Sequence, residues 1–183
     1  EAIVVDNFSD EDIDAVVKDF GDSRIVLVKY VDEGNPSITK DNFPSSGIIA
    51  ASRNLGLEKA RGEWTAYLDS DDKWRPEKLE RCLGAVGEES NVVGHGLVMF
   101  RGNKELRTIH SGPESKARYR RLLFEGSCMT PSAVMIRTDF LRSLGGCTEG
   151  GNYRTGEDYE LWMKMALAGA RFAFIPDILT DYR

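Results

Sequence analysis

Short apolar runs alternate with helix-like segments through the first half of the chain. The runs cover residues 2–5, 25–28 and 64–68, and the helix-like segments cover residues 9–20, 48–60 and 76–86. Continuous apolar runs of this length are typical of strands buried on both faces, and their alternation with helices is the pattern of an α/β sheet. The first half therefore predicts an α/β fold with parallel strands.

Turn and capping residues set the expected ends of these segments. Ser9 is placed to cap the first helix, which should end before Gly21. Gly62 is placed as the C-cap of the second helix, and Pro76 suits the first turn of the third. The polar stretch 32–46 should be a long loop, a kind of segment that often covers a site.

The second half mixes strand and helix patterns. Strands are expected at residues 92–93, 97–100, 108–109, 133–136 and 172–175, and helices at residues 119–123, 138–144 and 157–168. Gly102-Asn103 suits a turn between strands, and Gly145-Gly146 suits a helix end. We therefore expect a mixed sheet.

Size and charge restrict the class of protein. A chain of 183 residues can bury the core of one domain, and its net charge of −6 provides no general basic field for nucleic acid or anionic lipid. Any phosphate must be held locally, for example by a metal ion. Three widely spaced cysteines form neither a disulfide framework nor a CxxC site, and no apolar run is long enough to cross a membrane. A reducing, cytoplasmic location is the expectation.

Three carboxylates follow the third apolar run directly, in the segment Leu68-Asp69-Ser70-Asp71-Asp72. Open α/β sheets bind ligands at the carboxyl ends of their strands, and an Asp-x-Asp pair can direct two carboxylates at one Mg²⁺ or Mn²⁺ ion. Such an ion would hold a diphosphate and stabilise it as a leaving group. The same aspartates also fit a simple turn ahead of the helix at Pro76, and spacing alone does not choose between these interpretations.

A second pair of carboxylates, Glu157-Asp158, stands at the expected start of a helix after Gly156. One carboxylate could cap the helix while the other acts as a general base toward an attacking hydroxyl, or both could serve capping alone. Arg53 could meet a phosphate or pair with an acid at the surface. Trp74 lies beside the aspartates and is the best candidate for an exposed ring.

In order and spacing, these segments resemble the GT-A glycosyltransferases of family 2. The segments that carry the resemblance are AIVVDNFSD (2–10), ASRNLGL (51–57), ARGEW (60–64), LDSDD (68–72), SAVMIR (132–137), GG (145–146), TGEDYELW (155–162) and YR (182–183). The resemblance implies a three-layer α/β/α sandwich with a mixed, mostly parallel central sheet, in one domain over residues 1–183. Residues 1–90 would form the nucleotide-binding half and residues 91–183 the acceptor-binding half.

The resemblance also implies an inverting transfer of a sugar from a nucleotide diphosphate, usually a UDP-sugar, to an acceptor hydroxyl. Asp6, Asn7, Arg53 and Asp69 would bind the nucleotide-sugar, Asp71 and Asp72 a divalent metal, Mn or Mg, and Asp158 would be the catalytic base. Asp6, Asp69 and Asp71 would lie along one edge of the sheet. The acceptor would be a glycan, a lipid-linked sugar or a protein, and nucleic acid would not be a partner.

Two kinds of departure from the family pattern are visible. The family's opening strand and its C-terminal tail are missing here, so the nucleotide pocket of this sequence would be incomplete. Asn7 and Phe8 stand where Asp and Gly are common, and Cys147-Thr148 where Phe-Asp is common. Flanking segments could add peripheral attachment at the inner face of the membrane.

Two rival functions remain open at this point. One is a non-catalytic nucleotide-sugar-binding domain of a larger glycan-assembly protein. The other is a nucleotidyltransferase on a related α/β fold, although neither a GxxxxGK[ST] nor a GxGxxG phosphate loop occurs in the sequence.

Overall fold

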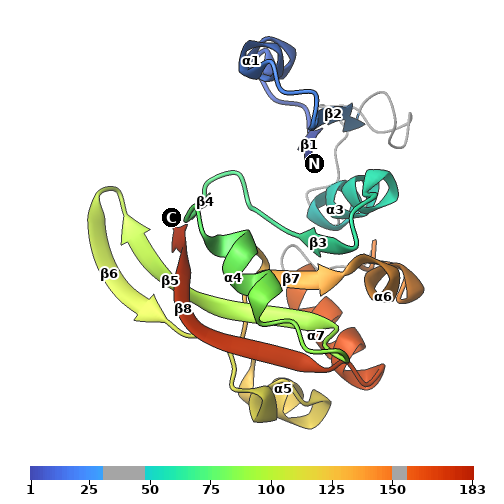
Figure 1. Cartoon of the computed structure of the whole chain (residues 1–183), viewed down its shortest axis with the longest axis vertical. Coiled ribbons are helices and arrows are strands. Elements are labelled where there is room, and N and C mark those ends of the chain that lie inside the picture. The colour runs from blue at the N-terminus through green and yellow to red at the C-terminus, as the bar shows by residue number, and fades with distance from the viewer. Residues whose placement is uncertain (31–47, 150–155) are drawn as a thin grey trace. The chain divides into compact units, whose positions relative to one another are not determined.

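The computed structural model describes residues 1–30, 48–149 and 156–183, and the predicted loop 32–46 lies outside these residues. The chain divides into two units (Figure 1). The first unit contains residues 1–62 and 145–157, and the second contains residues 63–144 and 158–183. Each unit has its own sheet and its own hydrophobic cluster.

The first unit is built on two parallel strands. Strands β1 (Ala2–Asp6) and β2 (Ile25–Lys29) pair in register from Ala2 opposite Ile25, and helix α1 (Ile13–Phe20) connects them. Helix α3 (Ile48–Lys59) packs against β1, where Gly56 leaves room for the side chain of Val5. Buried Val28, Tyr30 and Leu55 form the centre of this cluster. The βα alternation predicted for the start of the chain is confirmed.

Two helix ends in the first unit differ from the prediction. Asp12, and not Ser9, caps α1, because the Asp12 carboxylate accepts the N–H of Ala15 at 3.1 Å. The N–H of Ser9 instead donates to the side chain of Asp6 at 3.0 Å. Helix α3 ends at Lys59, and Gly62 lies beyond it with its N–H bonded to Glu1.

The second unit is built on a six-stranded sheet with the order β3-β7-β5-β8-β4, and β6 pairs with β5. Its strands are β3 (Trp64–Ala66), β4 (Lys73–Trp74), β5 (Val92–Arg101), β6 (Lys104–Ile109), β7 (Val134–Arg137) and β8 (Phe172–Tyr182). Its helices are α4 (Lys78–Gly84), η1 (Glu114–Lys116), α5 (Tyr119–Glu125), η2 (Pro131–Ala133), α6 (Thr138–Ser143) and α7 (Glu157–Leu167), of which Glu157 falls in the first unit.

The sheet is mixed, as predicted, but the predicted excess of parallel pairs is wrong for the described strands. Only β1–β2 and β5–β8 are parallel among them, and the other pairs are antiparallel. The hairpin at Gly102, whose φ is 58°, returns the chain directly onto β5. Such tight turns join antiparallel neighbours, whereas parallel neighbours need a long crossover.

Strand β8 is much longer than the predicted run 172–175, because it continues past Pro176 to Tyr182. Pro176 cannot donate to the ladder, and the pairing with β5 shifts at that point: Gly94 lies opposite Phe174, but Gly96 lies opposite Ile178. The irregularity accommodates the proline, and the strand resumes beyond it.

The apolar residues of helix α4 do not all lie on its buried face. Leu79 and Leu83 are 47% and 51% exposed, whereas Cys82 is fully buried. Lys78 is only 1% exposed and its ammonium lies 3.5 Å from the centroid of the Trp74 ring. The long aliphatic stem of lysine fills an inward position that an apolar pattern does not mark.

Candidate active site

The three aspartates after β3 form a turn at the end of the strand. The N–H of Asp72 donates to the carbonyl of Asp69 at 3.0 Å, which closes the turn over Ser70 and Asp71. Asp71 is exposed, whereas Asp69 and Asp72 are half-buried. The turn interpretation and the site interpretation of this segment are therefore compatible, because the turn itself presents the carboxylates.

Ser132 holds this turn to the rest of the second unit. Its hydroxyl, which is fully buried, accepts the N–H of Asp69 at 3.0 Å. Its carbonyl accepts the indole N–H of Trp74 at 2.9 Å and the hydroxyl of Thr180 at 2.8 Å. One residue of η2 thus fixes the start of the turn, strand β4 after it, and strand β8.

Ser132→Ala should lower the free energy of unfolding by about 1–2 kcal/mol, because the N–H of Asp69 would lose its partner in a half-buried setting. The backbone bonds from Trp74 and Thr180 should survive, since they use the carbonyl. Urea unfolding monitored by circular dichroism measures the change. Ser143→Ala is the matched control: its hydroxyl bonds the Phe140 carbonyl at an exposed position, so it should cost far less. Equal losses in the two variants would contradict the anchoring role.

Asp72 is the aspartate whose surroundings most favour a cation. Burial raises the pKa of this carboxyl above its ordinary value, hydrogen bonds from the Ser132 side chain and the Arg183 backbone oppose that rise, and the charges of Asp71 and Asp69 add to it. Its Oδ1 accepts the backbone N–H of Arg183 at 3.0 Å, while its Oδ2 is buried without a hydrogen-bond partner among the described residues. A carboxylate in this state is stabilised by any positive charge that reaches Oδ2.

The end of strand β8 reaches the same turn. Strand β4 pairs antiparallel with β8, with Lys73 opposite Asp181, and just beyond this pair the side chain of Asp72 accepts the N–H of Arg183. Burial raises the pKa of the Tyr182 phenol, and four nearby negative charges raise it further. These charges belong to Asp72, Asp69, Asp71 and Asp158. The second unit thus brings the predicted base into the neighbourhood of the three aspartates.

Asp158 occupies the first turn of α7. Its Oδ1 accepts the N–H of the next residue, Tyr159, at 2.7 Å. Helix α7 is held by buried Leu161, Trp162 and Met165, and the hydroxyl of Tyr159 donates to the carbonyl of Leu122. A base on such a helix has a fixed position relative to the sheet.

The residues predicted to bind the nucleotide lie in the first unit, with the exception of Asp69. Asp6 ends β1 and accepts the N–H of Ser9, and the side-chain oxygen of Asn7 is buried without a partner among the described residues. Asp6 ends β1, which pairs with β2 in the first unit, and Asp69 follows β3, which pairs with β7 in the second, so the common sheet edge expected for them stays a prediction. Strand β3 has only three residues, and β7 is its partner.

Arg53 is paired and mostly buried. Its guanidinium contacts the Glu157 carboxylate at 2.8 Å, and the two side chains are 11% and 16% exposed. Next to it, Asn54 bonds both the N–H and the carbonyl of Cys147 at 2.8 Å. Gly146 has a φ of 66°, and a Cβ there would lie 2.3 Å from the Asn54 side chain. One structural cluster of the first unit therefore contains three separate sequence segments: Arg53-Asn54, Gly145-Gly146 and Gly156-Glu157.

Ser132 and Tyr182 belong to segments that carry the resemblance, SAVMIR and YR, but neither residue was given a role in the site from the sequence. Serine and tyrosine occur throughout the chain, and only the folded arrangement gives these two their neighbours. Trp74 was expected as an exposed ring, but the structure has it half-buried, with its N–H bonded and the Lys78 ammonium over one face. Trp74 therefore packs behind the turn.

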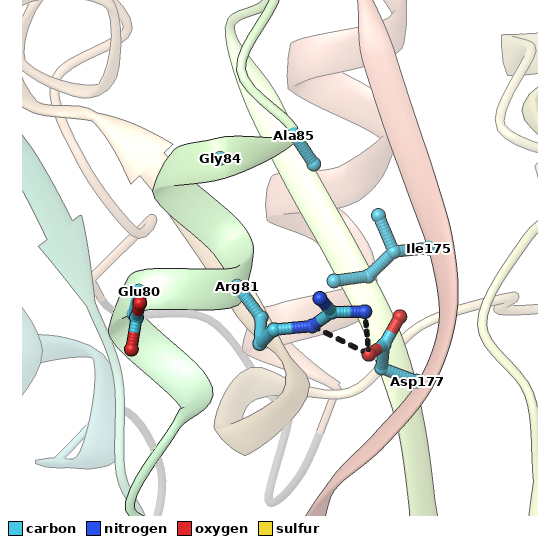
Figure 2. A pocket seen from close by; sticks show the side chains of 6 residues that line it. All are labelled: Glu80, Arg81, Gly84, Ala85, Ile175 and Asp177. Carbon is cyan, nitrogen blue, oxygen red and sulfur yellow. Dashed lines mark hydrogen bonds and ion pairs between the residues drawn. The ribbon is translucent and has the colours of Figure 1, made fainter.

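Two pockets of the second unit lie apart from these residues. Figure 2 shows the first, of about 350 Å³, in which Arg81 points at Asp177 with an Nη2–Oδ1 distance of 2.6 Å. The second, of about 630 Å³, is lined by residues 87–90 with Glu114, Arg171 and Phe172. Neither lining includes a predicted site residue.

Within the part of the chain that the structure describes, no helix has the length and apolar character needed to span a bilayer.

Comparisons with known proteins give consistent matches. The family Glycosyl transferase family 2 matches residues 1–145. The chain is 28% identical to the putative teichuronic acid biosynthesis glycosyltransferase TuaG of Bacillus subtilis, with all of this chain and 67% of TuaG covered. It is 23% identical to the Escherichia coli UDP-Glc:alpha-D-GlcNAc-diphosphoundecaprenol beta-1,3-glucosyltransferase WfaP, covering 65% of that protein.

Solved structures share the fold. Residues 1–349 of TarS from S. aureus match with a TM-score of 0.72 and 21% identity, over all of this chain and 50% of that one. The same TarS fragment in complex with UDP-GlcNAc matches with a TM-score of 0.72 and 20% identity, over 99% of this chain and 48% of that one. The chain thus spans about half of the TarS fragment, and only 25% of another relative, the uncharacterized glycosyltransferase RC0461 of Rickettsia conorii.

Proposed function

The chain belongs to glycosyl transferase family 2, and from this we propose that it is the nucleotide-sugar-binding core of an inverting enzyme that moves a sugar onto an acceptor hydroxyl. The observation that carries the proposal is the set of carboxylates around Tyr182, which includes the turn after β3 and the start of α7. A UDP-sugar is the proposed donor, since TarS was solved with UDP-GlcNAc and WfaP is named for UDP-Glc. A glycan or lipid-linked sugar is the proposed acceptor.

We propose that a divalent metal binds at the turn. The buried, unpartnered Oδ2 of Asp72 and the crowding of Asp69, Asp71 and Asp72 leave a local excess of negative charge. No group of three metal-ligating side chains is assembled among the described residues. Mg²⁺ and Mn²⁺ commonly take one or two carboxylates and complete their shell with water and substrate phosphates. We propose Asp71 and Asp72 as the ligands; a bound ion would supply positive charge to the departing diphosphate.

The residues of the chain would then divide the reaction between them. Asp158 would accept the proton of the acceptor hydroxyl as the new bond forms between the acceptor oxygen and the anomeric carbon. The bond from that carbon to the diphosphate oxygen breaks, and the nucleotide diphosphate leaves. Asp69 would contact the donor, with Asp6, Asn7 and Arg53 serving the nucleotide.

Asp71→Ala should abolish the coupling between Mn²⁺ and UDP. In the wild-type protein, Mn²⁺ should tighten UDP binding by about tenfold or more, because the ion would bridge protein and diphosphate. Isothermal titration with UDP, with and without Mn²⁺, measures the coupling. Asp139→Ala removes an exposed carboxylate of the same unit outside the site and should leave the coupling unchanged.

Two results of this titration would count against the proposal in different ways. Equal coupling in the wild type and in Asp71→Ala would remove Asp71 from the metal site. Intact coupled binding without release of UDP from any UDP-sugar, even with acceptor, would favour the non-catalytic nucleotide-sugar-binding domain over an enzyme.

A further inference from the structure

Helix α5 is attached to the second unit along one side only. Leu122 is fully buried, and its carbonyl accepts the hydroxyl of Tyr159 from α7. Ala117, just before the helix, is 2% exposed. Figure 1 shows α5 at the periphery of the second unit, below the sheet in this view. The orientation of α5 is therefore fixed by the inward position of Leu122.

The outward side of α5 combines a cation with a large apolar ring. Successive residues of a helix are about 100° apart, so Arg120 and Phe124, two positions before and after Leu122, point away from the unit. Phe124 is 77% exposed and its neighbour Leu123 is 48% exposed. The exposed Phe124 ring does not stabilise the fold, since apolar surface contributes to stability only when it is buried.

The charge of this segment is opposite to that of the whole chain. Residues 116–125 carry four basic side chains and one acidic one, a net charge of +3, whereas the chain as a whole carries −6. Arg121 pairs with Glu125 at 2.6 Å. Within the described parts of the chain, Lys116, Arg118 and Arg120 form no ion pair and are exposed. We call Lys116, Arg118, Arg120, Leu123 and Phe124 together the basic aromatic patch.

We propose that the basic aromatic patch docks the protein onto the surface of a membrane that contains anionic lipid. Helices that lie in a membrane interface combine Lys and Arg with Phe or Leu, and the two kinds of side chain serve the phosphate headgroups and the acyl boundary respectively. Basic side chains near an anionic leaflet are attracted to its negative surface potential. The patch shows both features, with Lys116, Arg118 and Arg120 for the phosphates and Leu123 and Phe124 for the acyl boundary.

The proposed partner is a bilayer surface, and its phosphate headgroups are attracted to the basic side chains of the patch by charge. The proposal does not depend on the proposed sugar transfer, because docking is measured without donor or acceptor. It places membrane attachment on residues of the chain itself, whereas the sequence-based expectation was that flanking segments could add it.

Cosedimentation with vesicles tests the proposal. The purified protein should bind vesicles of phosphatidylcholine mixed with phosphatidylglycerol, bind weakly to phosphatidylcholine alone, and lose binding at high salt. Arg120→Glu should weaken binding to the mixed vesicles by about tenfold or more, because it removes an attraction and adds a repulsion. Phe124→Ser should weaken binding to them with little change in salt dependence.

Two control variants are matched to these changes. Lys104→Glu reverses an exposed charge at the start of β6, and Phe20→Ser removes a ring of similar exposure, 72%, on α1. Both should bind vesicles like the wild type, and a thermal melt confirms that each variant folds. The proposal is overturned if the wild type does not bind the mixed vesicles, if Arg120→Glu and Phe124→Ser bind as well as the controls, or if the patch variants lose only a protein self-association seen without lipid.

Discussion

Asp158→Asn should slow the release of UDP from a UDP-sugar by about three orders of magnitude, the middle of the range for loss of a general base. The amide has nearly the shape of the carboxylate and can still accept the N–H of Tyr159 through its oxygen, so helix α7 should keep its start. What the variant lacks is a group that can take a proton. Turnover of UDP-GlcNAc and UDP-glucose, followed as UDP release, measures the effect.

The control for Asp158→Asn is Asp177→Asn. It removes the same charge from the same unit, in the pocket where Asp177 pairs with Arg81 and outside the set of carboxylates near Tyr182. Release should be close to the wild-type rate in this variant. Near-wild-type release by a well-folded Asp158→Asn would show that another group is the base.

Lys78→Met should raise the free energy of unfolding by about 3 kcal/mol near neutral pH. Burial lowers the pKa of the Lys78 ammonium to about 7, from 10.5, so the fold bears the cost of burying a charge wherever the unfolded chain is protonated. The contact with the Trp74 ring offsets part of that cost. Methionine fills a similar volume without a charge.

The direction of the stability difference between Lys78→Met and the wild type follows from its pH dependence. Below about pH 7 Lys78 is protonated in both the folded and the unfolded state, so the full cost of burying its charge is present. Between pH 7 and 10.5 the unfolded state binds more protons than the folded state, so wild-type stability rises with pH through this window. The advantage of Lys78→Met should therefore shrink as the pH rises and vanish near the upper end. Chemical denaturation at several pH values measures it.

Lys73→Met is the matched control for this series, since Lys73 is an exposed lysine on β4. Its stability relative to the wild type should not change across the same window. A constant difference for Lys78→Met at all pH values would mean that Lys78 is not charged at a cost in the folded protein.

The predictable part of the fold lies where local pattern and tertiary packing agree. Strands β1 and β2 are continuous apolar runs that are parallel neighbours, and Gly21 ends α1 with a φ of 61°, as a glycine C-cap should. Helix α4 defeats the pattern, because Lys78 is inside while Leu79 is exposed. Burial of a lysine depends on the Trp74 ring that covers it, which periodicity along one helix does not contain.

The site divides in the same way. The aspartates after β3 and Asp158 could be named from the sequence, because they stand in the segments LDSDD and TGEDYELW, which carry the resemblance to family 2. Their proximity to Tyr182 could not, since it depends on the length of β8, and Pro176 hid that length. The anchoring role of Ser132 could not be predicted for a related reason: its partners are a main-chain N–H, an indole and a threonine from three segments.

The bond from Arg183 to Asp72 is made by the main chain, and this has a consequence for how the position can vary. Every amino acid except proline carries the same backbone N–H, so nineteen side chains could occupy position 183 and still orient this carboxylate. Substitutions at position 183 would then leave this hydrogen bond unchanged, and an alignment of relatives would show a variable position where the geometry is constant. The side chain of Arg183 takes no part in this hydrogen bond.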